Sequence, residues 1–238
     1  MTRFFPAILA MAAGAALSSM PAQAQSSDPM LRDSLVTANR ILSDVGIVDA
    51  FGHISARSVE HKDRMLISRS LGPELVSASD IIEVDITSCE PVGKGPIKTY
   101  LERFIHCSIY RARPEVRSIV HSHSPSVIPF GATGKPLRPI YHMSGFLGRG
   151  APTFEIRQSA GNASDMLVSN AGIGDALAAT LDRSAVVVMR GHGSTAVGET
   201  IEQVVYRAIY TEKNAQLQLL AEGLGPVTFL NEQEAEAA

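Results

Sequence analysis

Segments with the two-residue periodicity of strands and segments with the helical period of about 3.6 residues alternate along most of this chain. Helices are predicted over 30–44, 95–114, 125–130, 172–181 and 200–222, and strands over 47–57, 64–69, 81–86, 116–122, 138–143, 153–157 and 184–191. We find no repeat and no interior linker in this pattern. Such interleaving predicts one α/β domain in which helices cover a central sheet.

The first 24 residues differ from the rest in composition. They carry one basic residue, Arg3, an apolar run from Phe4 to Leu17, and small residues at Ala22 and Ala24. This pattern is typical of a secretory signal peptide cleaved after Ala24. A membrane anchor is disfavoured because a spanning helix needs about 20 apolar residues. We therefore expect a periplasmic or secreted protein with no membrane attachment after cleavage, organised as a signal peptide (1–24), a polar lead (25–30), a folded domain (31–231) and a frayed polar tail (232–238).

Charge and cysteine content narrow the classes of function. The chain has 21 Lys and Arg against 24 Asp and Glu, a formal net charge of −3, so nothing favours nucleic acid over a small-molecule partner. Cys89 and Cys107 are too few for a disulfide scaffold and match no cysteine metal motif. An oxidising compartment permits one bridge, but the sequence does not show whether the two residues are close enough. Any metal site must therefore use histidine and carboxylate ligands.

Three histidines stand at predicted strand ends. His121 and His123 are two residues apart in VHSHSP, so they project to the same side of a strand and can share one metal ion. His192 lies between two glycines after an apolar strand, where α/β proteins often build sites. Three such ligands leave a position open for water or substrate. Glu102, on the preceding helix, is a candidate ligand or acid/base. The alternatives are surface histidines and a solvated glutamate paired with a nearby arginine.

The segments TYLERFIHCSIYRARPEVRSIVHSHSP and RGHGSTAVGETIEQVVYRAIYTEKNAQLQLLA resemble the class II aldolase/adducin family in order and spacing, and FGHISAR resembles its early turn. The resemblance covers roughly residues 31–225. It implies a three-layer α/β/α fold around a mostly antiparallel sheet, and a homotetramer with active sites at subunit interfaces. It also implies that His121, His123 and His192 bind one divalent ion per subunit, zinc before Mn²⁺, Mg²⁺ or Fe²⁺, and that Glu102 is the catalytic acid/base.

Departures from the family pattern bear on the substrate. Sugar-phosphate aldolases of this family have Gly-Asn in the early turn and Ser-Ser before the catalytic glutamate, where this chain has Gly52-His53 and Tyr100-Leu101. The loss of these small polar donors argues against a phosphorylated substrate. His142 stands where such aldolases have a proton-donating tyrosine, and it serves either as that donor or only in packing. Similarity to the decarboxylase branch marks five candidate substrate-binding residues: His53, Ser55, Ser70, Gly72 and Tyr100.

The predicted function is a metal-dependent carbon–carbon lyase acting on a small non-phosphorylated hydroxy, keto or aromatic acid through a metal-stabilised enolate. Decarboxylation is slightly favoured over aldol cleavage. A same-fold iron oxygenase, dehydratase or epimerase is one alternative. An adducin-like binding module without activity is another, which is disfavoured because adducin-type domains tend to lose the metal histidines that this chain keeps.

Overall fold

The computed structural model describes residues 27–93 and 95–238, so the predicted signal peptide lies outside the described residues. Within them, seven strands form one sheet. They are β1 (His53–Arg57), β2 (Arg64–Ser68), β3 (Ile81–Asp85), β4 (Ser118–Ser122), β5 (Thr153–Phe154), β6 (Val186–Met189) and β7 (Gly193–Gly198). Their order is β3-β2-β1-β4-β7-β6-β5, and every neighbouring pair is antiparallel except β5 with β6.

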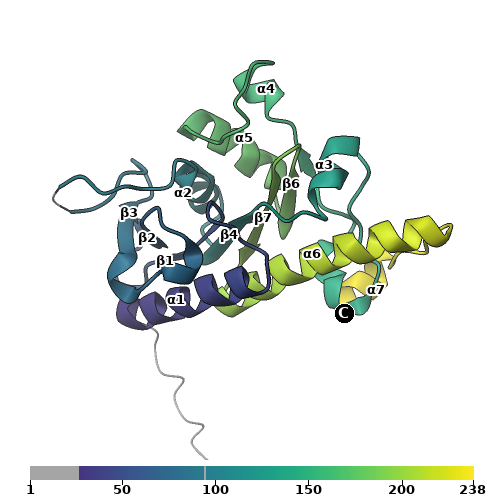
Figure 1. Ribbon diagram of the computed structural model, residues 1–238, viewed down its shortest axis with the longest axis horizontal. Coiled ribbons are helices and arrows are strands. Elements are labelled where there is room, and N and C mark those ends of the chain that lie inside the picture. The colour runs from purple at the N-terminus through teal and green to yellow at the C-terminus, as the bar shows by residue number, and fades with distance from the viewer. Residues whose placement is uncertain (1–26, 94) are drawn as a thin grey trace, which may run out of the picture.

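Helices cover both faces of this sheet (Figure 1). They are α1 (Asp28–Asp44), α2 (Arg103–Ala112), α3 (Ile128–Thr133), α4 (Arg157–Ala160), α5 (Ala171–Leu181), α6 (Ile201–Leu224) and α7 (Glu232–Ala237), with short 3-10 helices η1 (Pro73–Leu75), η2 (Ala78–Asp80) and η3 (His142–Leu147). Adjacent residues of β4 point to opposite faces: Val120 packs in the cluster that holds α1 and α6, and Ile119 in the cluster that holds α2 and α5. The predicted α/β/α class with a mostly antiparallel sheet is confirmed. No helix in the described part of the chain is long and apolar enough to cross a membrane.

The predicted strand at 184–191 is one arm of a hairpin. It is shortened to β6, and a turn of Arg190, Gly191 and His192 leads into β7, a strand that the sequence analysis missed. Gly191 has a φ of +64°, which favours glycine. Gly193 lies so close to β4 that a Cβ there would overlap the carbonyl oxygen of Ser122. The glycines on either side of His192 therefore allow the turn and bring β7 against β4.

The predicted strand at 138–143 is wrong. Pro139 in this stretch has no backbone donor, and side chains of α6 take the place of a neighbouring strand. The N–H of Ile140 donates to Asn214 Oδ1 at 2.9 Å, and Asn214 Nδ2 donates to the carbonyl of Arg138 at 2.8 Å. The segment then turns into η3, so His142 begins a 3-10 helix rather than lying in the sheet.

The predictions of a helix at 95–114 and of a frayed tail at 232–238 also change. The helix expected from residue 95 begins only at Arg103, and residues 95–102 form an irregular segment whose Tyr100 hydroxyl donates to the carbonyl of Leu71 at 2.6 Å. The tail expected to be frayed forms α7 instead. Asn231 caps this helix by accepting the N–H of Glu234, and Ala235 is buried beside Gly145.

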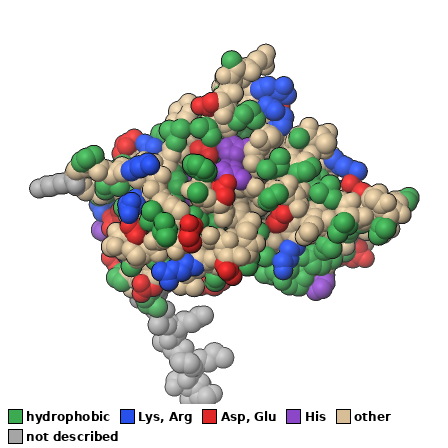
Figure 2. Space-filling model, viewed as in Figure 1, with side chains coloured by type: hydrophobic (Ala, Val, Ile, Leu, Met, Phe, Trp, Pro, Cys, Tyr) green, Lys and Arg blue, Asp and Glu red, His purple; other side chains and the backbone are tan. Residues whose placement is uncertain are grey.

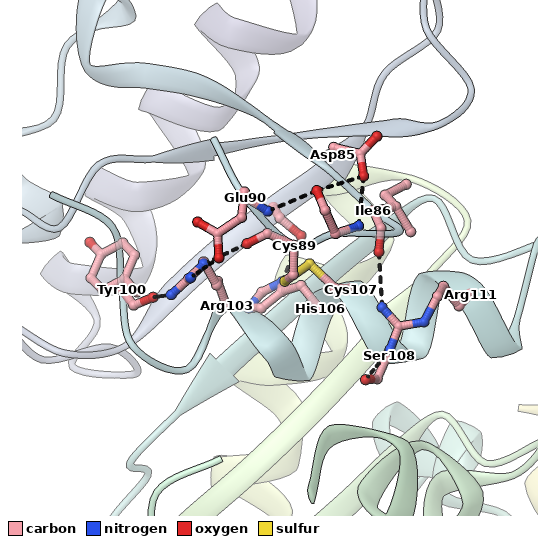
Figure 3. The surroundings of a disulfide bond; sticks show 12 residues. Asp85, Ile86, Cys89, Glu90, Tyr100, Arg103, His106, Cys107, Ser108 and Arg111 are labelled. Atoms are coloured by element: carbon pink, nitrogen blue, oxygen red, sulfur yellow. Dashed lines mark hydrogen bonds and ion pairs between the residues drawn. A yellow bond between two sulfur atoms is a disulfide. The ribbon is translucent and has the colours of Figure 1, made fainter. Parts of the chain in front are cut away.

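Cys89 and Cys107 form a disulfide with their Cα atoms 5.9 Å apart (Figure 3). The bridge ties the turn after β3 to α2, and both residues are buried. Arg103, at the first position of α2, adds a hydrogen bond from Nε to the carbonyl of Cys89 at 2.6 Å and an ion pair with Glu90 at 2.9 Å. These links fix the start of α2, where Glu102 is the N-cap residue.

Candidate metal centre

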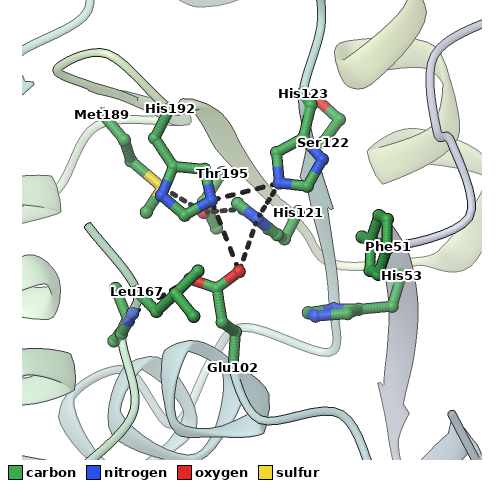
Figure 4. A network of polar contacts seen from close by, with 12 residues as sticks. Phe51, His53, Glu102, His121, Ser122, His123, Leu167, Met189, His192 and Thr195 are labelled. Carbon is green, nitrogen blue, oxygen red and sulfur yellow. Dashed lines mark hydrogen bonds and ion pairs between the residues drawn. The ribbon is translucent and has the colours of Figure 1, made fainter. Parts of the chain in front are cut away.

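Four side chains from three parts of the fold converge on one point (Figure 4). The Nε2 atoms of His121 and His192 lie 3.3 and 3.1 Å from Nε2 of His123. Glu102 Oε2 lies 3.5 Å from the His121 nitrogen and 3.3 Å from the His192 nitrogen. His121 belongs to β4 and His123 follows its end, as the two-residue spacing predicted, while His192 lies in the β6–β7 turn.

The outer nitrogen of each ring has its own partner. His192 Nδ1 lies 2.9 Å from the carbonyl oxygen of Met166, and His123 Nδ1 lies 3.1 Å from both carboxylate oxygens of Asp49. A carbonyl or a carboxylate only accepts, so these Nδ1 atoms carry the proton and the Nε2 atoms are left with a lone pair. Metal-binding histidines are typically oriented in this way.

His121 fits the same arrangement. Its Nδ1 lies 3.4 Å from the hydroxyl oxygen of Thr195, and that hydroxyl donates to the sulfur of Met189 at 3.5 Å. The oxygen of Thr195 is thus free to accept the Nδ1 proton, and His121 Nε2 also presents a lone pair to the centre. Three imidazole lone pairs facing one another make poor hydrogen-bond partners but a ready set of metal ligands.

Glu102 is buried and ionised. Its Oε1 accepts the N–H of Val168 at 2.9 Å, which leaves Oε2 directed at the histidines. Burial opposes the charge, but the adjacent His121 and His192 rings outweigh it in the metal-free centre and hold the pKa of Glu102 well below its usual range. Burial lowers the pKa of His121. For His192 the burial effect is outweighed by the Glu102 carboxylate, and the pKa is raised.

The donor set fits a divalent cation. Zinc takes imidazole nitrogen at about 2.0–2.1 Å, and two such ligands at a tetrahedral angle are about 3.3 Å apart, close to the 3.1 and 3.3 Å separations of the Nε2 atoms. Three nitrogens and one carboxylate oxygen match the ligand chemistry of catalytic zinc sites. His121, His123 and His192 would hold the ion, and Glu102 lies where a fourth ligand or a base would stand.

A pocket of about 530 Å³ lies beside the cluster. Its lining residues are Phe51, His53, Ser70, Lys98, Thr99, Tyr100, Leu101, Glu102, His123 and Leu167. Phe51 and His53 lie to one side of Glu102 and Leu167 to the other (Figure 4). Histidine side chains are visible among hydrophobic and acidic ones near the centre of the face shown in Figure 2. The pocket thus combines apolar walls with a single lysine and a polar floor.

Behind the pocket, His53 leads into a buried polar chain. His53 Nδ1 lies 2.7 Å from His106 Nε2, His106 Nδ1 lies 2.6 Å from Ser55 Oγ, and Ser55 Oγ lies 2.9 Å from the Tyr110 hydroxyl. Burial lowers the pKa of His53 well below its usual value and that of His106 to about 3, so both rings are neutral.

Of the remaining predicted site residues, some line the pocket and the others do not. Ser70 and Tyr100 line the pocket with His53. Ser55 is fully buried within the chain behind it, and Gly72 caps η1 without lining the pocket. His142 is exposed, and its ring packs against Tyr141 with centroids 6.0 Å apart. Within one protomer, the structure does not bring His142 to the metal cluster.

Sequence reasoning missed several residues of the site. Asp49, which orients His123, and Lys98, which lines the pocket, lie in irregular segments that carry no motif. Phe51, which also lines the pocket, begins the FGHISAR segment but was not singled out within it. Tyr110 looks from sequence like a core residue of α2. The signal that could have found it is spacing: Glu102, His106 and Tyr110 recur every four residues, so they lie along one side of α2 and its N-cap.

Comparison with known proteins agrees with this geometry. The family model of the Class II Aldolase and Adducin N-terminal domain matches residues 33–219. The chain is 40% identical over 223 residues to the decarboxylase tropJ of Talaromyces stipitatus, with 84% of each chain covered. It is 31% identical over 202 residues to a 3,4-dihydroxyphthalate decarboxylase of a Terrabacter species, with 79% of this chain and 80% of that protein covered.

Solved structures share the fold. An L-fuculose 1-phosphate aldolase from Glaciozyma antarctica PI12 superposes with a TM-score of 0.74 at 27% identity, over 91% of this chain and 84% of that one. Human beta-adducin is 27% identical over 194 residues, which cover 76% of this chain but only 25% of beta-adducin. The family match and the 40% identical relative lead to one conclusion: this chain belongs to the class II aldolase and adducin family.

Proposed function

We propose that this protein is a divalent-metal-dependent carbon–carbon lyase that decarboxylates a small, non-phosphorylated hydroxylated aromatic acid. The observation that carries the proposal is the convergence of three histidine Nε2 atoms and one buried glutamate carboxylate, of which His123 and Glu102 also line the pocket. Zinc is the resident ion that we favour, since the ligand set and the nitrogen separations suit it. A bound cation would act as a Lewis acid that draws electron density from a substrate oxygen.

The chain's own residues supply the rest of the chemistry. In a decarboxylation, the bond between the carboxyl carbon and the substrate carbon breaks, carbon dioxide leaves, and the electron pair left on the carbon takes a proton. Glu102 lies at the histidine cluster with one carboxylate oxygen directed at it, so it can accept a proton from a substrate hydroxyl and later return one to the carbon. Its second oxygen is held by the N–H of Val168, which fixes the direction of the first.

The pocket supports an aromatic acid as the substrate. Phe51, Tyr100 and Leu167 offer apolar and aromatic surface to a ring, and Lys98 offers a cation to a carboxylate. The small polar residues expected of a phosphate site are replaced by Tyr100 and Leu101. Two of the similar proteins are named decarboxylases, one of them for 3,4-dihydroxyphthalate, a hydroxylated aromatic acid. Aldol cleavage is the second candidate, because a similar fold is found in L-fuculose 1-phosphate aldolase.

We further propose that the mature protein is exported and that it forms a homotetramer with active sites between subunits. Export is supported by the disulfide between Cys89 and Cys107, a bond that persists in oxidising compartments. A subunit interface is supported by the exposed position of His142, which could reach a site only on another protomer. Cell fractionation tests the first point, and sedimentation analysis of the protein from residue 25 onward tests the second.

The function is tested by turnover with defined metals. Protein reconstituted separately with Zn²⁺, Mn²⁺ or Fe²⁺ is mixed with 3,4-dihydroxyphthalate and with mono- and dihydroxybenzoates, and products are followed by mass spectrometry. We expect carbon dioxide and the matching phenol, loss of turnover in His123→Ala, and retention in His61→Ala, which alters an exposed histidine. Aldehyde release would favour aldol cleavage, and oxygen consumption with iron would favour an oxygenase. Failure to convert any of these acids with any metal contradicts the proposal.

A further inference from the structure

Four buried side chains form a continuous hydrogen-bonded chain from the pocket into the core. The order is His53, His106, Ser55 and Tyr110, and the three donor–acceptor distances are 2.7, 2.6 and 2.9 Å. All four residues are at most 1% exposed. Because each neutral member has one proton to share along the chain, the direction of one hydrogen bond determines the direction of the others.

The Tyr110 end sets this direction. Its hydroxyl has two possible acceptors, Ser55 Oγ at 2.9 Å and the carbonyl of Arg117 at 3.4 Å. The second distance is long for an O–H···O bond, which is usually about 2.5–3.0 Å. Tyr110 therefore donates to Ser55.

The remaining bonds follow in sequence. Ser55 accepts from Tyr110 and so donates its single proton to His106 Nδ1. A neutral His106 that accepts at Nδ1 carries its proton on Nε2 and donates to His53 Nδ1. His53 then has its own proton on Nε2. Since His53 lines the pocket and Nδ1 is already used, Nε2–H is the group that it offers to a ligand.

We propose that the His106–Ser55–Tyr110 chain holds His53 in its Nε2–H form, and that His53 donates this hydrogen bond to a substrate oxygen beside the metal-binding histidines. The proposal rests on the function proposed above. The His53 ring lies with its centroid 5.2 Å from that of His121 and 4.5 Å from that of Tyr100, between the metal cluster and the pocket wall. A donor in this place favours acids with a carboxylate, carbonyl or phenolate oxygen next to the atom that binds the metal.

The chain orients His53 but does not supply the reaction with a proton. If His53 lost its Nε2 proton and each member passed one along, Tyr110 would become a buried phenolate. Burial raises the pKa of Tyr110 far above its usual value, which opposes this outcome. His106, Ser55 and Tyr110 are therefore positioning residues, and only His53 would touch the substrate.

The tautomers can be observed directly. Zinc-loaded protein labelled with ¹⁵N-histidine gives long-range ¹H–¹⁵N spectra that distinguish Nε2–H from Nδ1–H rings, and His→Gln variants assign the signals. We expect His53 and His106 to be Nε2–H in the wild type. Tyr110→Phe and Ser55→Ala should each let His53 populate both forms. Ser118→Ala is the matched control, because it removes an equally buried serine hydroxyl that bonds the backbone of Ser55 outside the chain.

A wild-type His53 in the Nδ1–H or doubly protonated form overturns the proposal, as does a spectrum that Tyr110→Phe and Ser55→Ala both leave unchanged. If Ser55→Ala fails to fold, Tyr110→Phe decides alone. Kinetics with a converted acid provide the second readout: kcat should fall on the order of tenfold or more in both variants with little change in KM, because the hydrogen bond strengthens in the transition state. Unchanged kcat overturns the role in the reaction. If no acid is converted, the proposed function fails while the spectra still decide the tautomer.

Discussion

Alanine in place of Gly193 should disturb the metal centre without touching a ligand. A Cβ at this position overlaps the carbonyl oxygen of Ser122 and lies 3.0 Å from the Cα of His123. Carbon atoms in contact are usually about 3.5–4.0 Å apart, and the overlap with the Ser122 oxygen is the more severe of the two contacts, so β7 and the end of β4 must separate by about 1 Å or more. This moves His192 relative to His123 by more than the ~0.5 Å tolerance of a preorganised site.

Two measurements follow from this displacement. Urea unfolding of the metal-free protein should show a loss of about 1–3 kcal/mol, the usual cost of overpacking a core. Zinc affinity, measured by competition with a chelator, should fall about 10–100-fold, as when ligand orientation is disturbed.

Gly223→Ala is the matched control for this substitution. Gly223 lies inside α6, and a Cβ there meets nothing within 4 Å. The change should raise stability by about 0.5–1 kcal/mol and leave zinc affinity unaltered. If Gly193→Ala keeps wild-type stability and wild-type zinc affinity, then β7 and β4 do not need a glycine at this position in order to lie so close together.

Three further predictions concern stability and pH. Replacing Cys89 and Cys107 by alanine should lower the free energy of unfolding by about 3 kcal/mol for a loop of this size, and a urea midpoint equal to that of the wild type contradicts it. Thr200→Ala, which removes the N-cap of α6, should cost about 1 kcal/mol and spare zinc binding. The Glu102 carboxylate raises the pKa of His192, so in the metal-free protein His192 should become doubly protonated at a higher pH than it does in Glu102→Gln. An NMR titration of the histidines in the metal-free protein checks this, and a His192 titration that Glu102→Gln leaves unshifted contradicts it.

The parts of the fold with strong local periodicity could be predicted from sequence. Segments such as 81–86 and 200–222 carry the pattern of their own element, and the structure places β3 and α6 there within two residues. The segment 138–143 carries an apolar pattern as well, but its backbone is satisfied by Asn214 and Gln218 of a helix more than 70 residues away. No local pattern contains that information.

The candidate site, too, could be predicted from sequence only where it depends on local geometry. The two-residue spacing of His121 and His123 and the glycines around His192 were readable, because each reflects the geometry of a single strand or turn. The buried chain behind His53 was not, because it joins β1 to α2 across more than 50 residues. Asp49 could not be recognised either, since its role follows only from where the loop before β1 meets the end of β4.

We propose that His121, His123 and His192 hold one divalent ion, and the metal stoichiometry of the purified protein tests this. The protein is purified from its native compartment without added metal or chelator, and metals are quantified by mass spectrometry together with protein concentration. We expect close to one zinc per chain in the wild type and in His61→Ala, and less than about a tenth of that in His123→Ala. Wild-type protein without a divalent metal, or metal content unchanged in His123→Ala, would contradict it.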